Sequence, residues 1–551
     1  MRYRRIHALQ AAGDWGEADG LIRRLDDPVL MGEVLAQRYL HPTAYRSSFD
    51  ELRTWLEHFA DHPDAQRIHR LALKRQPNGA PPPPQPVPGY LNGAGQELYH
   101  PPLPPYRSTR KRSPEQEDLV RRWRQEIVDL AARERPTQAL NELLDRRDVA
   151  PLIDRVEYDL ARWVIARGYF GADRFAEALR LAGPAANRSG HVEPEIHWTA
   201  GLAAWRLGQA SAAARHFSAL AEARNAAPGA DIARAAFWAA RAYLVAGKPS
   251  LFNYYMSMAA RGSHGFYGVL AHAVLGEQPA FQWYEQGLED GLLEVLWQFP
   301  GARRALALNQ IGLRERAERE IRKLGARADP RLSTALAALA AALDLPAAEM
   351  RVAQRLKLAD GSHHHGALFP LPSWQPQDGF RLDRALLYAV ARAESGFDAY
   401  AESPVGARGL MQLMPVAVRE AAERIGATPP GDDELFEPST NLALGQAYLE
   451  RLIEGKLCGG NLFYTAAAYN CGPTCLARWR KSLGIGDDPL LFLESLPSGE
   501  TRAYIKKVML NLWTYRARLR QTSPELADLA ENRWPIYRAL DGRTRPQHAR
   551  R

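Results

Sequence analysis

The sequence of 551 residues holds few cysteines and no long apolar run. Its 3 cysteines are too few for a small secreted domain held together by disulfides, and they leave room for one bridge at most. The longest nearly uninterrupted apolar stretch, Thr334 to Leu343, is about half of the ~20 residues that a membrane-spanning helix needs. These absences exclude a disulfide-rich miniprotein and predict no transmembrane helix.

The first residues also lack the apolar segment of a secretory signal peptide, because Asp14, Glu17 and Asp19 interrupt it. Taken literally, this start predicts a cytoplasmic protein. The chain also begins inside what resembles an amphipathic helix, which favours the alternative that the given start is trimmed or mis-assigned.

The composition is that of a folded, mildly basic protein. Hydrophobic residues make up 46% and charged residues 24%, which is close to the globular average. The length predicts roughly three or four domains. A net charge of +8 suits an anionic partner such as nucleic acid, an acidic membrane surface or an anionic cell-wall polymer.

Proline separates an N-terminal segment from the rest of the chain. Residues 1–80 predict short helices with polar breaks, and residues 81–113 predict a proline-rich basic linker or long surface loop. Of 39 prolines, ten lie between Pro81 and Pro105, where they exclude a regular helix or an inner strand. A docking segment for an aromatic-lined groove is the alternative.

Residues 114–360 predict an α-superhelical repeat domain of stacked helix pairs. Two kinds of residue recur at intervals of about 40 residues, which is longer than a tetratricopeptide unit. They are Gly168, Gly208 and Gly247, each expected in the turn of a helix–turn–helix unit, and Trp198 and Trp238. Because one helix pair cannot bury its apolar face alone, neighbouring pairs are expected to stack into a solenoid.

A second helical region without repeats is expected at 375–520, and a basic, solvated C-terminal tail at 521–551. The helical pattern breaks at 361–380, which predicts a domain boundary. Three adjacent histidines there, His363 to His365, lack carboxylate or cysteine partners at ligand spacing and do not predict a metal site.

One carboxylate in this second region is in an unusual position. Leu387, Val390, Ala391 and Glu394 share one face of a predicted helix that Asp383 can cap and Gly396 can end. Burial and the negative end of the helix dipole both raise the pKa of a carboxyl group there, as a general acid requires. A glutamate that reaches water, or pairs with Arg392 or Arg408, is the alternative.

Three further runs carry polar side chains at turns. GARGLMQLMP (406–415) predicts a short helix ended by or before Pro415, with the Gln412 amide suited to sugar groups. AAAYNCG (466–472) places Tyr469 and Asn470 before a glycine turn, and ESLPSGETRAYI (494–505) begins a new helix at Glu500.

Together with the Glu394-Ser395 pair, these runs occur in the order and spacing of the soluble lytic transglycosylase family. The resemblance covers about 380–515, and the preceding helices resemble the α-superhelical ring of that family at the level of pattern. It implies an all-α fold, with a superhelical solenoid followed by a lysozyme-like catalytic domain.

The resemblance also implies roles for individual residues. Glu394 matches the single catalytic acid and base, and the residues matching the saccharide site around it are Ser395, Ser403, Met411, Gln412, Met414, Tyr469, Asn470, Glu500 and Tyr504. The implied reaction cleaves peptidoglycan between N-acetylmuramic acid and N-acetylglucosamine and forms 1,6-anhydromuramoyl ends. It needs no metal or cofactor, its substrate is the glycan strand, and it implies a periplasmic location.

Three other functions remain open at this point. A muramidase of the goose-lysozyme type would use water in place of the muramoyl C6 hydroxyl. A non-catalytic peptidoglycan-binding scaffold is the second alternative. Glu394 argues against it, because a scaffold has no physical reason to keep a carboxylate on an apolar helix face. A nucleic-acid binder is suggested only by the net charge, because the basic residues are dispersed and carry no nucleic-acid motif.

The cysteines allow two states. Cys471 and Cys475 lie close in sequence, and either could form a disulfide with Cys458 in an oxidising compartment. Three free thiols are the favoured interpretation.

Overall fold

A computed structural model describes residues 2–93, 106–223, 232–261, 265–279, 281–283, 287–356 and 364–541. Throughout these residues the regular structure is helical, and extended segments pair only in isolated bridges such as Asn461 with Ile536. The predicted all-α fold is therefore confirmed. None of the described helices is long and apolar enough to cross a membrane.

By its internal contacts the chain divides into two units, each built from separate stretches of sequence. The first unit contains residues 1–98 and 281–448, and the second contains residues 99–280 and 449–542. The proposed boundaries at 80, 113, 360 and 520 stay predictions.

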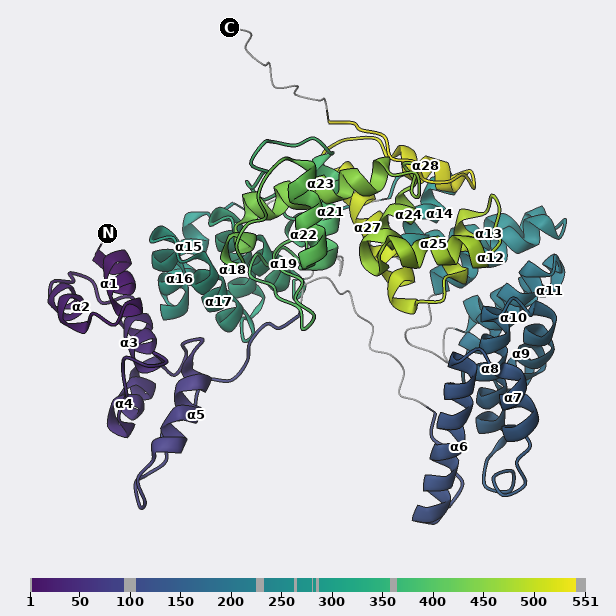
Figure 1. Ribbon diagram of the computed structural model, residues 1–551, viewed down its shortest axis with the longest axis horizontal. Helices are drawn as coiled ribbons and strands as arrows, with labels where there is room; N and C mark the ends of the chain where they lie inside the picture. Colours follow the sequence, from purple (N-terminus) through teal and green to yellow (C-terminus); the bar gives the residue numbers. More distant parts are fainter. Residues whose placement is uncertain are drawn as a thin grey trace, which may run out of the picture. The chain divides into compact units, whose positions relative to one another are not determined.

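Within its described residues, fourteen α-helices make up most of the first unit (Figure 1). They are α1 (Arg2–Ala11), α2 (Trp15–Ile22), α3 (Met31–Tyr39), α4 (Phe49–Phe59), α5 (Ala65–Arg75), α15 (Asp290–Trp297), α16 (Pro300–Gln310), α17 (Arg314–Gly325), α18 (Pro330–Ala342), α19 (Pro346–Ala353), α20 (His365–Leu368), α21 (Arg384–Glu394), α22 (Pro415–Arg424) and α23 (Pro438–Glu454), the last of which continues into the second unit. A buried core joins α16 to α19 through residues such as Ile321, Leu336 and Val352.

The proline-rich stretch is attached to the first unit at several points. Residues 80–93 have no regular secondary structure, as their prolines predict. The N–H of Val87 donates to the Ala60 carbonyl at 2.9 Å, and the N–H of Leu91 donates to the Arg322 carbonyl at 3.1 Å. This part of the predicted linker is therefore fixed against α17. The rest of the proline cluster, residues 94–105, lies outside the described residues.

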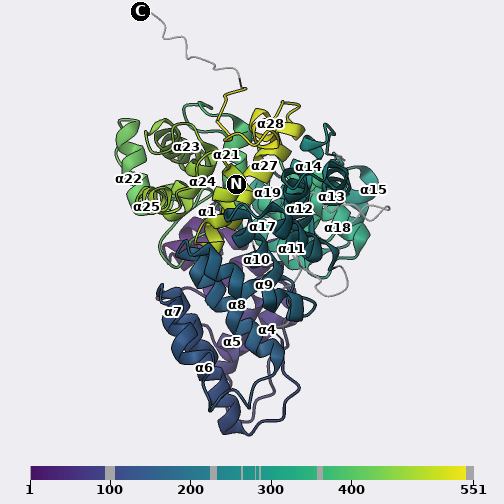
Figure 2. The same ribbon diagram turned by 90° about the vertical axis from the view of Figure 1, so that its right-hand side faces the viewer.

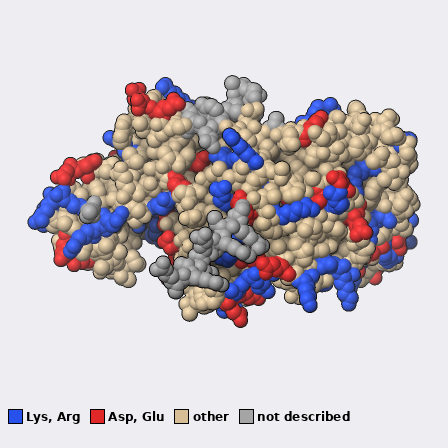
Figure 3. Space-filling view, turned by 90° about the horizontal axis from the view of Figure 1, so that it is seen from above, with Lys and Arg blue, Asp and Glu red and all other residues tan. Residues whose placement is uncertain are grey.

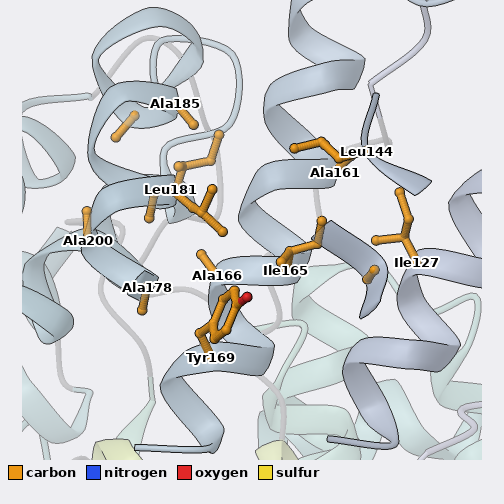
Figure 4. Close-up of a cluster of buried hydrophobic side chains, with 14 of the residues drawn as sticks. Ile127, Leu144, Ala161, Ile165, Ala166, Tyr169, Ala178, Leu181, Ala185 and Ala200 are labelled. Atoms are coloured by element: carbon orange, nitrogen blue, oxygen red, sulfur yellow. The ribbon is translucent and has the colours of Figure 1, made fainter. Parts of the chain in front are cut away.

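The second unit begins with the solenoid. Its helices are α6 (Pro114–Ala132), α7 (Pro136–Gln138), the π-helical turn Ala139–Leu143, α8 (Arg155–Gly171), α9 (Phe175–Ser189), α10 (Glu195–Arg206), α11 (Ala210–Glu222), α12 (Ile232–Val245), α13 (Pro249–Arg261) and α14 (Phe266–Val274). Figures 1 and 2 show α8 to α11 running beside one another, and each contacts the next. Small and branched side chains fill the space between α6 and α10 (Figure 4).

The repeat pattern is confirmed at two of the three glycines. Gly208 and Gly247 lie in turns between helices, at φ values of +71° and +72° that favour glycine. Gly168 lies inside α8 instead, where a Cβ atom would come within 3.1 Å of Pro136 and 3.2 Å of Ala131. Its prediction as a turn residue was wrong, because close packing of neighbouring helices also selects glycine.

The remaining helices of the second unit are α24 (Leu462–Cys471), α25 (Pro473–Ser482), α26 (Pro489–Ser495), α27 (Gly499–Arg518) and α28 (Pro524–Ala530). A buried polar cluster joins them to the solenoid. The hydroxyl of Tyr267 on α14 donates to the Glu494 carboxylate at 2.5 Å, and Lys506 on α27 pairs with Glu494 at 2.6 Å. These bonds lower the pKa of Glu494 against the effect of its burial.

The C-terminal segment buries several side chains on α28, so the prediction of a solvated tail from 521 was wrong for this part. Arg516 on α27 pairs with Glu525 on α28 at 2.7 Å, and both side chains are fully buried. Further along, the ring of Trp534 packs against Tyr464 and Phe492. Residues 542–551 lie outside the described residues.

The surface charge is mixed in sign. On the face shown in Figure 3, Lys and Arg side chains alternate with Asp and Glu side chains over the described residues. On this face the basic side chains are thus dispersed, as the sequence predicted. All three cysteines are free thiols, and Cys458 is buried. His364 and His365 are both buried, and His363 lies outside the described residues.

Candidate active site

Helix α21 ends at Glu394, the predicted acid. Leu387, Val390 and Ala391 are at most 2% exposed, while Glu394 is half-buried in the last turn. The predicted position on an apolar face at the helix end is confirmed. The carbonyl groups at this end carry partial negative charge and disfavour a second negative charge beside them. The raised pKa of Glu394 stays a prediction.

The start of α21 is held by a residue that the sequence analysis missed. Asp383 occupies the N-cap position as predicted, but its side chain makes no capping hydrogen bond. The backbone N–H groups of Arg381 and Leu382 instead donate to Oε1 of Gln446 on α23, at 2.7 and 3.0 Å. In the sequence, Gln446 is surrounded by apolar and small residues, which was the available signal for this role. Its side chain is fully buried, where a polar group needs hydrogen-bond partners.

The chain turns sharply after Glu394. Gly396 and Phe397 have φ values of +60° and +62°, and the Phe397 side chain is 1% exposed. A left-handed conformation costs about 1–2 kcal/mol for a residue other than glycine, so surrounding contacts must hold it. One such contact is the Ser395 hydroxyl, which donates to the Leu410 carbonyl at 2.7 Å. Ser395 thus ties the helix end to the following loop.

That loop is not the predicted short helix. Gly409 and Gln412 have φ values of +75° and +46°, which break a right-handed helix. Arg408 and Leu413 exchange backbone hydrogen bonds of 3.2 and 3.1 Å across the turn. Pro415 begins α22, where its missing N–H costs nothing, and does not end a helix.

Asn441 on α23 supports this turn through side-chain hydrogen bonds, and the sequence did not predict this role. Its Oδ1 accepts from the Met411 N–H at 2.9 Å, while its Nδ2 donates to the Arg408 carbonyl at 3.1 Å and the Leu435 carbonyl at 2.8 Å. The side chain is fully buried. It therefore fixes the backbone on both sides of Gly409.

The other predicted residues of this loop differ in access to solvent. Met411 is fully buried, so it lies beneath the turn, whereas Met414 is 42% exposed. The Gln412 Nε2 group donates to the Ala401 and Gly409 carbonyls, both at 3.0 Å. The Ser403 hydroxyl accepts from the Ala407 N–H at 2.9 Å.

Gly409 offers a test of this arrangement. An added Cβ atom would lie 2.2 Å from Asn441 Nδ2 and 2.4 Å from the Leu435 carbonyl oxygen. We expect Gly409→Ala to destabilise the first unit by about 3 kcal/mol, from backbone strain and overpacking. Gly406→Ala is the matched control, because Gly406 has φ +85° but open space around its Cβ position. Its expected cost is about 1 kcal/mol. Equal unfolding free energies for the two variants would contradict the packing at Gly409.

The two arginines considered as partners of Glu394 each contact other groups of the first unit. Arg392 donates to the Leu368 carbonyl at 2.9 Å, and its guanidinium lies 3.9 Å from the ring centre of Phe369. Arg408 pairs with Glu402 at 3.1 Å and with Asp432. These contacts fix both guanidinium groups within the first unit.

Glu318 on α17 is a second carboxyl group near the turn after Glu394. Burial, with the negative charge of Asp398 as the next cause, raises its pKa from 4.5 to about 7. Arg351 and Arg322 oppose this shift. The folded protein therefore binds a proton at Glu318 between pH 4.5 and 7 that the unfolded chain lacks, so stability from this group is present below pH 4.5 and is lost as the pH rises through 7.

A Glu318→Gln variant should lack this part of the pH dependence. We expect the free energy of unfolding of the unmodified protein to fall, relative to the variant, on the order of 3 kcal/mol between pH 4.5 and 8. The measurement is denaturant unfolding of both proteins across this range. Parallel stability curves would show that Glu318 titrates normally.

Four predicted site residues come together in the second unit. The rings of Tyr469 and Tyr504 stack with centroids 6.4 Å apart and planes 8° apart. The Asn470 Oδ1 atom accepts from the Thr501 hydroxyl at 2.7 Å, which links α24 to α27. Glu500 is exposed in the first turn of α27, as predicted. Thr501, in the same GETRAY run, was not recognised as the partner of Asn470.

Among the described residues, Glu33, His62 and Asp64 form a buried group that could surround a metal ion. Their protonation opposes this role. His62 Nδ1 accepts from the Asp64 N–H at 3.1 Å, so the neutral ring carries its proton on Nε2, which lies 3.2 Å from Glu33. Burial lowers the pKa of His62, which favours this neutral form. With Arg316 on Glu33 and Arg319 on Asp64, the group is better described as a network of ion pairs.

Residues 373–490 match the transglycosylase SLT domain family. This segment of the chain is similar to the soluble lytic transglycosylase family. The matched segment includes Glu394, the Gly409–Gln412 turn and Tyr469.

Curated relatives are similar over the same part of the chain. The soluble lytic murein transglycosylase of Escherichia coli (strain K12) is 35% identical over 134 residues, which cover 24% of this chain and 20% of that protein. The Salmonella typhimurium protein of the same name is 33% identical over 151 residues, covering 27% and 23%. The matched segment thus spans about a fifth of these relatives.

Solved structures extend the similarity of fold to nearly the whole chain. The 70 kDa soluble lytic transglycosylase of Escherichia coli has a TM-score of 0.61 at 17% identity, covering 97% of this chain and 99% of that one. Lytic transglycosylase Slt of Pseudomonas aeruginosa has a TM-score of 0.59 at 21% identity, covering 97% and 88%. The predicted architecture of superhelical solenoid and lysozyme-like domain is confirmed.

Proposed function

We propose that this protein is a peptidoglycan lytic transglycosylase that cleaves the β-1,4 bond between N-acetylmuramic acid and N-acetylglucosamine. The observation that carries the proposal is Glu394, half-buried at the end of an apolar helix within an SLT domain. The curated relatives that share this segment are named as murein transglycosylases.

In the proposed reaction, Glu394 acts first as acid and then as base. The protonated carboxyl group donates its proton to the glycosidic oxygen as the bond from that oxygen to muramoyl C1 breaks. The resulting carboxylate takes the proton from the muramoyl C6 hydroxyl, whose oxygen bonds to C1. The product is a 1,6-anhydro ring, and no water is consumed. Because the nucleophile is already part of the same sugar, its effective concentration is high.

The surrounding residues have distinct proposed roles. Both amide hydrogens of Gln412 are directed to backbone carbonyls, so its Oε1 atom is the group proposed to accept a hydrogen bond from the saccharide. Met414 is exposed and is proposed to pack against a sugar face, while Ser403 lines the same loop. Buried Ser395 and Met411 support the loop. Tyr469, Asn470, Glu500 and Tyr504 stay proposed saccharide-site residues on α24 and α27.

The proposed substrate implies the proposed location. Glycan strands lie outside the cytoplasmic membrane, so we infer that the protein acts in the periplasm. No cofactor enters the proposed reaction. Other partners, in cell-wall synthesis or secretion, are not assigned.

Product analysis tests the proposal and separates it from hydrolysis. Purified peptidoglycan would be digested in water enriched in oxygen-18, and the released sugars would be weighed by mass spectrometry. We expect 1,6-anhydro products that are lighter than hydrolysis products by one water and carry no label. Labelled reducing ends would identify a muramidase. Failure to release sugars from several peptidoglycan types would favour a binding scaffold.

A further inference from the structure

Residues 87–93, here called the strap, follow the first prolines of the proline-rich stretch and are bound to α17 and α19 by side chains as well as by backbone. Lys323 donates to the Val87 carbonyl at 2.6 Å, and Arg322 donates to the Leu91 carbonyl at 2.9 Å. Arg351 donates to the Gly93 carbonyl at 2.7 Å. The guanidinium of Arg322 also lies 4.8 Å from the ring centre of Tyr90. The strap thus fixes two guanidinium groups in place.

Both of these arginines also reach the turn that follows Glu394. Arg322 and Arg351 lie 3.5 and 3.4 Å from the same oxygen, Oδ2 of Asp398. The side chain of Arg351 is 3% exposed and that of Asp398 is 23% exposed. Electrostatic attraction in such a sheltered position is stronger than at an open surface. Asp398 is therefore held from two helices at once.

Asp398 is connected by hydrogen bonds to the loop of the proposed site. Its Oδ1 atom accepts from the Tyr400 N–H at 3.1 Å, and its backbone carbonyl accepts from the Ala401 N–H at 3.2 Å. The Ala401 carbonyl in turn accepts from Gln412 Nε2 at 3.0 Å. A continuous set of contacts therefore runs from the strap through the arginines and Asp398 to Gln412.

We propose that Asp398, held by Arg322 and Arg351, is a positioning residue that keeps the turn of residues 395–401 in its active arrangement. The inference rests on the proposed transglycosylase function. It assigns the strap a role in catalysis, since the strap orients the two arginines. The left-handed conformation of Phe397 makes the turn dependent on such support, because that conformation is strained for a residue other than glycine.

Glu318 adds to the same cluster. It lies 3.5 Å from Arg322 and 3.7 Å from Arg351, so two carboxyl groups share two guanidinium groups. The groups that face it are Arg322 on its own helix, Arg351 on α19, Asp398, and the hydroxyl groups of Tyr90 and Tyr400. With Glu318 mostly protonated below neutral pH, Asp398 is the main negative partner of both arginines.

The test compares Asp398→Asn with Asp64→Asn. Asparagine retains the shape and the acceptor for Tyr400 but loses the charge that binds the arginines. Asp64 is a matched control, since it is also sheltered and shared by two arginines, Arg319 on α17 at 2.7 Å and Arg67 at 3.5 Å. Its contacts do not include the 395–401 turn.

Two measurements are made on the full-length chain. Turnover of soluble glycan strands gives kcat and KM, and hydrogen exchange with mass spectrometry reports opening of residues 395–412. We expect Asp398→Asn to lower kcat about ten- to a hundredfold, with KM within about twofold, because small misplacements of an acid cost rate. We also expect faster exchange in this segment. Asp64→Asn should leave kcat and this exchange unchanged.

The outcomes separate the inference from the proposed function. Equal kcat and equal exchange for Asp398→Asn and the unmodified protein would overturn the inference, and so would equal losses in both variants. If the unmodified protein forms no anhydro product, the proposed function fails. The exchange measurement then still decides whether Asp398 holds the turn.

Discussion

Glu394→Gln should reduce the release of anhydro sugars from peptidoglycan by about 10²–10⁴-fold, the range for loss of a general acid–base group. The amide has nearly the shape of the carboxyl group but can neither donate a proton to the glycosidic oxygen nor accept one from the C6 hydroxyl. Because one group is proposed for both steps, loss of Glu394 affects both halves of the reaction. Binding of the glycan should persist, since the rest of the loop is unchanged.

Glu423→Gln on α22 is the matched control for this variant. Glu423 is exposed in the same unit and takes no part in the turn. Initial rates would be measured by quantifying anhydro products, and binding by co-sedimentation with peptidoglycan. A Glu394→Gln protein with normal turnover would rule out Glu394 as the catalytic group. Loss of both turnover and unfolding stability would assign it a structural role.

The helix spacing was enough to predict the position of Glu394, because three apolar neighbours on the same face define the buried side of α21. The same reasoning predicted the start of α27 at Glu500 and the turns at Gly208 and Gly247. These features depend on residues close in sequence, where periodicity and turn chemistry are decisive.

The turn at Gly409–Gln412 could not be predicted in this way. Its left-handed Gln412 lies in a loop that Asn441, about 30 residues later, fixes through hydrogen bonds to Met411 and Arg408. Local propensity in the run GLMQLM favours a helix, and the tertiary contact overrides it. The fixed position of the strap could not be predicted for the same reason, since Arg322 and Arg351 bind its carbonyls from more than 200 positions away.

The C-terminal segment was assigned to solvent because arginines outnumber acids in it. A count of charges does not reveal that Arg516 and Glu525 are paired out of water. Arg516 also donates to Gln521 at 3.3 Å and to the Arg538 carbonyl at 3.2 Å. This single guanidinium therefore holds three points of the segment against α27.

Glu525→Ala should destabilise the second unit by about 3–5 kcal/mol, because it leaves the buried charge of Arg516 without its anionic partner. Replacing both residues, as Arg516→Met with Glu525→Leu, should recover most of this loss, since no unpaired charge remains. Asp118→Ala is the control: it breaks the exposed pair with Arg122 at 3.0 Å on α6, where less than about 1 kcal/mol is expected. Urea unfolding followed by tryptophan fluorescence measures all three. A Glu525→Ala variant as stable as the double variant would show that the pair does not hold the segment. The expected order would show that α28 belongs to the core of the second unit.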